Sequence, residues 1–142
     1  MPCPNLLNPM KPKVIFVCIG NSCRSQMAEG FARSITGGRV EVFSAGSRPA
    51  GTVNPAAVSV MKEIGIDISR QHSKGVDSLP REKYDAIVTM GCGDACPHFP
   101  AKARIDWKIP DPVGGTHETF VAVREQVRQL VTELLSDKTI FP

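Results

Sequence analysis

The segment CIGNSCR, residues 18–24, places a cysteine and an arginine with five residues between them, directly after an apolar run. Successive backbone N–H groups in a loop of this length can point inward at one anion, and Gly20 and Asn21 tolerate the conformations that such a curl needs. The guanidinium of Arg24 matches two oxygens of a tetrahedral oxyanion. The same groups would stabilise Cys18 as a thiolate, so we expect it to be a nucleophile.

The oxyanion-binding residues predicted by this pattern are Ile19, Gly20, Asn21, Ser22, Cys23 and Arg24. Ser25 follows directly and could hydrogen-bond the Cys18 thiolate or assist its departure. The alternative is a strand, a turn and a helix with a buried, unreactive cysteine at the end of the strand.

Three further cysteines lie outside this segment, at Cys3, Cys92 and Cys96. An odd total of five and the lack of a targeting segment argue against a framework of structural disulfides. Reactive thiols are therefore expected, with two alternatives for Cys92 and Cys96. They could be zinc ligands together with His98, although no second ligand pair lies nearby, or they could be inert loop residues.

Apolar patterns predict strands and helices in alternation. Strands are expected at 14–17, 40–44, 84–90 and, as a short fourth, 104–107, and helices at 25–35, from the Asn54 N-cap to Gly65, and at 120–134. This alternation predicts an α/β fold with a parallel sheet between helices. Such sheets bind ligands at the carboxyl ends of their strands, where the segment 18–24 begins.

The length of 142 residues corresponds to one domain, expected at 13–142 after a flexible, proline-rich tail at 1–12. A formal charge of +3 with scattered basic residues predicts no nucleic-acid partner. No apolar run is long enough to span a membrane, and the first residues do not form a signal peptide. We therefore expect a cytoplasmic protein with no membrane partner.

The segment VCIGNSCRSQMAEGFAR resembles the phosphate-binding loop and first helix of the low-molecular-weight tyrosine phosphatase superfamily. Within it, the sequence is most similar to the thioredoxin-coupled arsenate reductases, and the similarity continues through VFSAGSRPAGTVNPAAVSVMKEIGIDIS, YDAIVTM and DWKIPDPVG. This resemblance implies a three-layer sandwich around a central four-stranded parallel sheet. It also implies that the chain reduces arsenate to arsenite, for arsenic detoxification.

The resemblance assigns three more residues to the reaction. Asp111, in a loop rich in proline and glycine, would be the general acid that protonates the leaving oxygen; alternatively it only caps a turn. Cys92 would attack the Cys18 adduct, and Cys96 would resolve the resulting disulfide. The gap between Cys92 and Cys96 is shorter than in many relatives, which leaves the order of thiol attack open.

Some relatives bind potassium beside the loop, but Lys74 stands where they have an acidic ligand, so we expect no metal. The resemblance implies no tightly bound cofactor, but an external dithiol reductant: thioredoxin, or a glutaredoxin-like donor. Phosphate and sulfate would compete with arsenate. The alternative function is a tyrosine or small-ester phosphatase that uses Cys18, Arg24 and Asp111. Cys23 is either a packing residue or a protective partner for oxidised Cys18. Lys74 either places its ammonium beside the loop or is a solvated surface residue.

Overall fold

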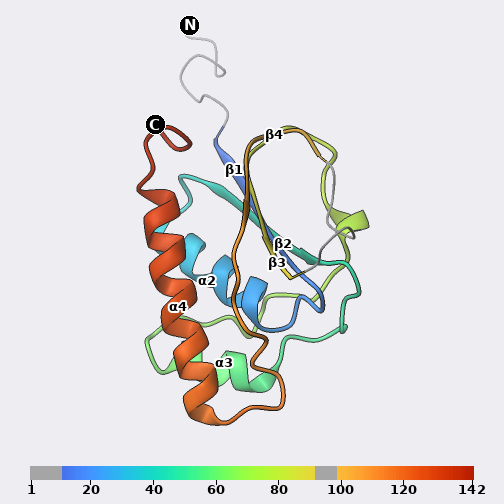
Figure 1. Cartoon of the computed structure of the whole chain (residues 1–142), viewed down its shortest axis with the longest axis vertical. Helices are drawn as coiled ribbons and strands as arrows, with labels where there is room; N and C mark the ends of the chain where they lie inside the picture. The colour runs from blue at the N-terminus through green and yellow to red at the C-terminus, as the bar shows by residue number, and fades with distance from the viewer. Residues whose placement is uncertain (1–10, 92–98) are drawn as a thin grey trace, which may run out of the picture.

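The computed structural model describes residues 11–91 and 99–142. Its strands form one sheet of four parallel strands in the order β2-β1-β3-β4 (Figure 1). The strands are β1 (Lys13–Cys18), β2 (Glu41–Gly46), β3 (Tyr84–Met90) and β4 (Ala101–Asp106). The helices are α2 (Arg24–Thr36), α3 (Pro55–Lys62), α4 (His117–Leu135) and the short 3₁₀ helix η1 (Val76–Ser78). The predicted α/β class and four-stranded parallel sheet are confirmed.

Strand β1 lies inside the sheet, between β2 and β3, and its apolar residues are buried on both faces. It pairs with β2 on one side, where Ile15 lies opposite Phe43, and with β3 on the other, where Ile15 lies opposite Ile87. After β1 the chain forms β2 on one side of that strand, and it later forms β3 on the other side. This reversal is the place at which open parallel sheets bind ligands, between the ends of β1 and β3.

Capping residues mark the ends of α2 and α3. At the end of α2, Gly37 takes a left-handed conformation (φ +57°) and donates its N–H to the Arg33 carbonyl at 3.0 Å. At the start of α3, the Asn54 side chain accepts the Ala56 N–H at 2.8 Å. Helix α3 ends at Lys62 with Glu63 as its C-cap, earlier than the expected end at Gly65, and Gly65 instead closes the turn that follows with a positive φ.

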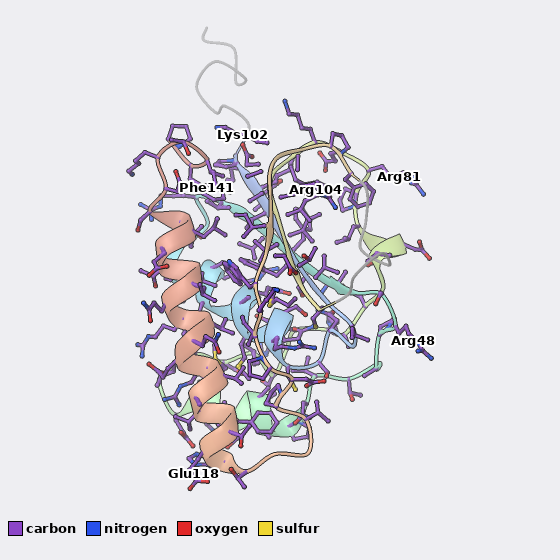
Figure 2. The ribbon with its side chains drawn as sticks, viewed as in Figure 1. Arg48, Arg81, Lys102, Arg104, Glu118 and Phe141 are labelled. Atoms are coloured by element: carbon purple, nitrogen blue, oxygen red, sulfur yellow. The ribbon has the colours of Figure 1, made fainter. Side chains whose placement is uncertain are left out.

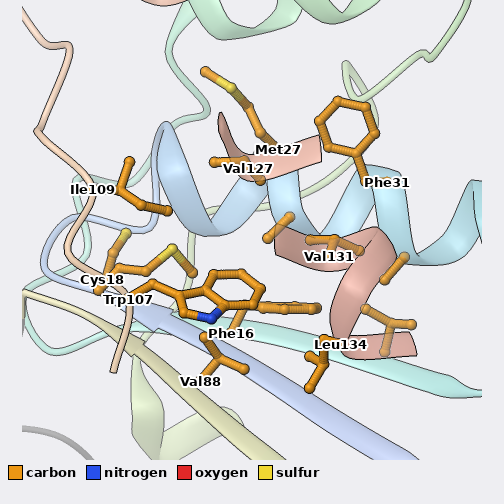
Figure 3. Close-up of a cluster of buried hydrophobic side chains, with 14 of the residues drawn as sticks. Phe16, Cys18, Met27, Phe31, Val88, Trp107, Ile109, Val127, Val131 and Leu134 are labelled. Carbon is orange, nitrogen blue, oxygen red and sulfur yellow. The ribbon is translucent and has the colours of Figure 1, made fainter. Parts of the chain in front are cut away.

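One face of the sheet carries the main core, which α2 and α4 cover (Figure 1). Figure 3 shows Cys18 at the end of this core, near Trp107 and Ile109, and the ring of Phe16 lies 5.9 Å from that of Trp107. A smaller apolar cluster lies on the opposite face, where η1 covers the sheet among the described residues. The active-site end of β1 is therefore fixed by packing on both faces.

Two element boundaries differ from the prediction. The fourth strand runs from Ala101 to Asp106 rather than 104–107, and Trp107 leaves it to pack into the core. Helix α4 begins at His117, three residues earlier than expected, because Thr116 is an N-cap whose hydroxyl accepts the Thr119 N–H. In Figure 2, the ribbon of α4 runs from Glu118, at one end of the molecule, toward Phe141 in the C-terminal segment. Across residues 11–91 and 99–142, no helix is long and apolar enough to cross a membrane.

Candidate active site

The loop that follows β1 is held from outside through its carbonyl groups. The carbonyls of Cys18, Ile19, Gly20 and Ser22 accept backbone N–H groups of residues 47–54 at 2.9–3.2 Å. These four hydrogen bonds anchor the loop to the segment 47–54 that follows β2. Gly46, the last residue of β2, makes this close approach possible, because a Cβ there would lie 2.5 Å from the Ile19 carbonyl oxygen.

Asn21 is the residue about which the loop turns. Its φ of +47° is the only positive φ of a non-glycine residue in the described ranges, and the residue is fully buried. This conformation directs its backbone N–H at the Cys18 Sγ, 3.2 Å away. The predicted inward curl of the loop is therefore present at this residue.

Cys18 and Ser25 are in direct contact. The Ser25 Oγ lies 2.9 Å from the Cys18 Sγ, and both residues are buried. Ser25 reaches the sulfur because it stands in the first turn of α2, directly after the loop. The contact between these two side chains, expected from the sequence, is present.

Arg24 connects the loop with two other segments that lie far from it in sequence. Its guanidinium donates to the Ile109 carbonyl at 3.0 Å and lies 3.8 Å from the Asp111 carboxylate. Gly91, at the end of β3, has a φ of +87°, and a Cβ there would lie 3.3 Å from the same guanidinium. Arg24 is itself buried, so its charge is held in place by these neighbours.

Asp111 has two contacts, one for each of the interpretations open from the sequence. One carboxylate oxygen accepts the Val113 N–H at 3.0 Å, which is a turn-capping contact. The other oxygen faces Arg24, and the side chain is 54% exposed. Asp111 therefore caps its turn and also stands beside the loop, where it can exchange a proton with solvent.

Cys23 lies at the N-cap position of α2 and is buried. Burial raises the pKa of the Cys23 thiol to about 11, and the negative charges of Asp111 and Cys18 act in the same direction. Its hydrogen bond with Ser22 and the charge of Arg24 oppose this shift. At neutral pH Cys23 is therefore a neutral thiol and a poor nucleophile.

The Lys74 ammonium lies beside the loop, so Lys74 is not merely a solvated surface residue. The Lys74 Nζ lies 3.0 Å from the His72 carbonyl oxygen, 3.3 Å from the Ser44 Oγ and 3.6 Å from a Glu29 carboxylate oxygen. Ser44 donates in turn to Glu29, which also pairs with Arg33. This buried carboxylate behind the loop is thus balanced by two cations.

Three residues of the site were not identified from the sequence. Gly46 and Gly91 are glycines whose close approach depends on long-range packing, and no local pattern marks them. Gln26 is fully buried and hydrogen-bonds the backbone and side-chain oxygens of Asn21. Gln26 lies within the segment that carries the family resemblance, but no chemical pattern in the sequence marks it as a contact of the loop.

Cys92, Cys96 and His98 lie outside the described residues, so their predicted roles remain predictions. Strand β3 leads to them: Met90 lies opposite Cys18 in the sheet, and only Gly91 separates Met90 from Cys92. Within residues 11–91 and 99–142, no three His, Cys, Asp or Glu side chains are grouped so that they could hold a metal ion.

Comparison with known proteins identifies the family. Residues 13–140 match the low molecular weight phosphotyrosine protein phosphatase family. A protein of Synechocystis sp. called glutaredoxin arsenate reductase is 42% identical over 127 residues, which cover 87% of this chain and 96% of that protein.

Two solved structures have the same fold. An arsenate reductase in the phosphate binding state superimposes with a TM-score of 0.79 at 41% identity, over 89% of this chain and 98% of the other. The Corynebacterium glutamicum thioredoxin-dependent arsenate reductase superimposes with a TM-score of 0.75 at 32% identity, over 94% of this chain and 63% of the other. This chain therefore belongs to the arsenate reductases of the low molecular weight phosphotyrosine protein phosphatase family.

Proposed function

We propose that this protein reduces arsenate to arsenite by a cascade of thiol and disulfide reactions that starts at Cys18. The observation that carries the proposal is the contact set of the Cys18 sulfur, which faces the Asn21 N–H at 3.2 Å and the Ser25 hydroxyl at 2.9 Å. Both neighbours can donate a hydrogen bond to a sulfur anion, which is the form that attacks in such a reaction. The arsenate reductases among its relatives support arsenate as the substrate.

In the first step, the Cys18 sulfur attacks arsenic, so that an S–As bond forms and an As–O bond breaks. Arg24 and the loop N–H groups bind the remaining oxygens. Asp111 gives its proton to the leaving oxygen, which then departs as water. The 3.8 Å approach of Asp111 to Arg24 and the exposure of its carboxyl group support this assignment.

In the second step, the Cys92 thiolate attacks the Cys18 sulfur. An S–S bond forms, the S–As bond breaks, and its electron pair stays on arsenic, which is thereby reduced from As(V) to As(III). The raised pKa of Cys23 supports a thiol outside the loop for this step. Cys96 then attacks Cys92, which releases Cys18 and leaves a Cys92–Cys96 disulfide.

An external dithiol must reduce that disulfide, and no tightly bound cofactor is needed. We propose thioredoxin as the donor, in line with the thioredoxin-dependent relative from C. glutamicum. The relative called glutaredoxin arsenate reductase makes a glutaredoxin-type donor the alternative. Such an exchange of thiols fits the cytoplasm, where reductants keep thiols reduced.

The test is a purified-protein assay in which arsenate is added to thioredoxin, thioredoxin reductase and NADPH. Wild type should oxidise NADPH in an arsenate-dependent manner, and Cys18→Ser, Cys92→Ser and Cys96→Ser should each abolish turnover. A second set with glutaredoxin and glutathione identifies the donor. No arsenate-dependent turnover with either donor system would refute the proposal.

A phosphatase activity is the second candidate, because it would use Cys18, Arg24 and Asp111 and has no need for Cys92 or Cys96; the 3.8 Å approach of Arg24 to Asp111 supports it. Hydrolysis of p-nitrophenyl phosphate measures it in the same preparations. If this hydrolysis is fast, depends on Cys18 and Asp111, and is unchanged in Cys92→Ser, while arsenate is not reduced, the protein is a phosphatase.

A further inference from the structure

A chain of hydrogen bonds runs behind the loop from Gln71 to the Cys18 sulfur. The Gln71 amide donates to the Gln26 Oε1 at 2.8 Å, and the Gln26 amide donates to the Asn21 Oδ1 at 2.9 Å. The Asn21 amide donates to the Ser25 Oγ at 2.7 Å, and Ser25 contacts Cys18. The middle of this chain is fully buried, so water cannot replace its bonds.

The orientation of the Gln26 amide is fixed by carbonyl groups. Its Nε2 lies 3.1 Å from the Asn21 carbonyl oxygen and 2.8 Å from the His72 carbonyl oxygen. Backbone carbonyls only accept hydrogen bonds, so the NH₂ end of the side chain must face them. The opposite end, Oε1, is left to accept from Gln71.

The orientation of the Asn21 amide is fixed in the same way. Its Oδ1 accepts from the Lys74 backbone N–H at 2.9 Å, a group that only donates, and from Gln26. Its Nδ2 must then face Ser25 at 2.7 Å and Ser44 at 3.0 Å, with one hydrogen for each. A flipped Asn21 amide would place its NH₂ group against two donors, the Lys74 N–H and the Gln26 amide.

Ser25 has a single hydroxyl hydrogen, and its oxygen already accepts from Asn21. The remaining contact is with the Cys18 Sγ, across which either atom could donate to a thiol, whereas a thiolate at Cys18 can only accept the Ser25 hydrogen. The Asn21 backbone N–H points at the same sulfur. As a thiolate, Cys18 is therefore an acceptor in both contacts, and both donors stabilise its charge.

We propose that Gln26 is a positioning residue of this site: by holding the Asn21 amide in one orientation, it leaves the Ser25 hydroxyl hydrogen free to bind the Cys18 thiolate. The inference rests on Cys18 being the nucleophile of the proposed function. Gln26 does not touch substrate and acts only through Asn21 and Ser25.

A substitution at Gln26 neither adds nor removes a charged group near Cys18. In the described part of the chain, the titratable or charged groups around the sulfur are Arg24 and Cys23 from its own loop and Asp111 from the loop before α4. Glu29 and Lys74 lie behind Ser44. An altered pH profile in a Gln26 variant would therefore report on the hydrogen-bond chain.

The test is the rate of iodoacetamide alkylation at Cys18, followed by mass spectrometry as a function of pH in the full-length protein without arsenate. The variants are Gln26→Met, which keeps the length of the side chain but cannot donate, and Gln71→Met at the outer end of the hydrogen-bond chain. Gln129→Met, on the exposed face of α4, is the matched control. Thermal unfolding is measured for each variant.

We expect Gln26→Met to lower the alkylation rate at neutral pH by about tenfold, the effect of losing one hydrogen bond to a charged acceptor, and to regain the wild-type rate at alkaline pH. Gln71→Met should shift the profile the same way by a smaller amount, and Gln129→Met should leave it unchanged. A folded Gln26→Met with the wild-type profile, or a rate reduced equally at every pH, would overturn the inference.

If Gln26→Met does not fold, Gln71→Met decides, and a wild-type profile for that variant overturns the inference. Because arsenate is absent from the assay, the result is separate from that of the proposed function. A Cys18 that is inert to alkylation in the wild type would instead contradict its role as nucleophile.

Discussion

Gly46→Ala tests whether the loop after β1 must be held in one position for activity. A Cβ at this residue would lie 2.5 Å from the Ile19 carbonyl oxygen and 2.9 Å from the Asn21 backbone nitrogen. The neighbours are main-chain atoms that are themselves hydrogen-bonded, so they cannot rotate away. To reach an ordinary contact of about 3.4 Å, the loop and β2 must separate by about 0.9 Å.

A displacement of this size affects activity more than stability. We expect arsenate-dependent turnover to fall by about 10²-fold, since a misplacement of about 1 Å has that effect on a positioned reacting group. Overpacking should lower the free energy of unfolding by about 1–3 kcal/mol, which is about 3–10 °C in melting temperature for a chain of this size. The assays are NADPH-coupled turnover and thermal unfolding by circular dichroism.

Gly75→Ala is the matched control, because Gly75 is the β-bridge partner of Gly46. A Cβ at Gly75 would meet only the Pro49 ring at 3.6 Å and the Gly46 carbonyl oxygen at 3.9 Å, which are ordinary contacts. Its turnover should stay close to wild type. If Gly46→Ala keeps wild-type turnover and melting temperature, the loop is not held as rigidly as its contacts indicate.

Three further predictions concern single side chains. Lys74→Met leaves the buried Glu29 carboxylate with one cation fewer, so urea unfolding should show a loss of about 2 kcal/mol, whereas an unchanged midpoint would mean that Lys74 is only a surface residue. Cys23→Ala should keep turnover within about threefold of wild type, because a thiol with a pKa of about 11 takes no part as a nucleophile; abolished turnover would contradict this. The hydrogen bond from His117 lowers the pKa of Glu63 below 4.5, so its stabilising effect is present above that pH and is lost as pH falls through the lower folded-state value. In urea titrations from about pH 7 to about pH 3, Glu63→Gln should therefore lose less stability than wild type, and an equal loss would refute the role of this contact.

The elements that bury apolar residues on both faces were predictable from sequence. Strand β1 contains the unbroken apolar run 14–17, strand β3 has the apolar run 86–88 at its centre, and both strands occur where expected. Strand β4 was expected too short, because it is an edge strand whose alternate residues are charged and exposed and whose inward residues include two alanines, Ala101 and Ala103. Small side chains give a weak apolar signal in the sequence. In the structure, β4 is a strand because it pairs with β3.

The active site likewise has a part that the sequence predicts and a part that depends on tertiary packing. The segment from Cys18 to Ser25 is local, and its residue types alone predict an oxyanion loop with a nucleophile, because a strand, a curl and a helix start follow one another in sequence. The approach of Asp111 to Arg24, by contrast, depends on how a loop more than eighty residues away packs on the sheet.

The chain itself therefore determined which residues can form an oxyanion loop and a thiolate, because backbone conformation and side-chain chemistry are local properties. Only the tertiary structure decided how that loop is held: by the absent Cβ of Gly46, by the ammonium of Lys74 and by the buried amide of Gln26. Hydrogen-bond direction and charge balance depend on donors and acceptors that folding brings from distant parts of the chain. No local pattern contains that information.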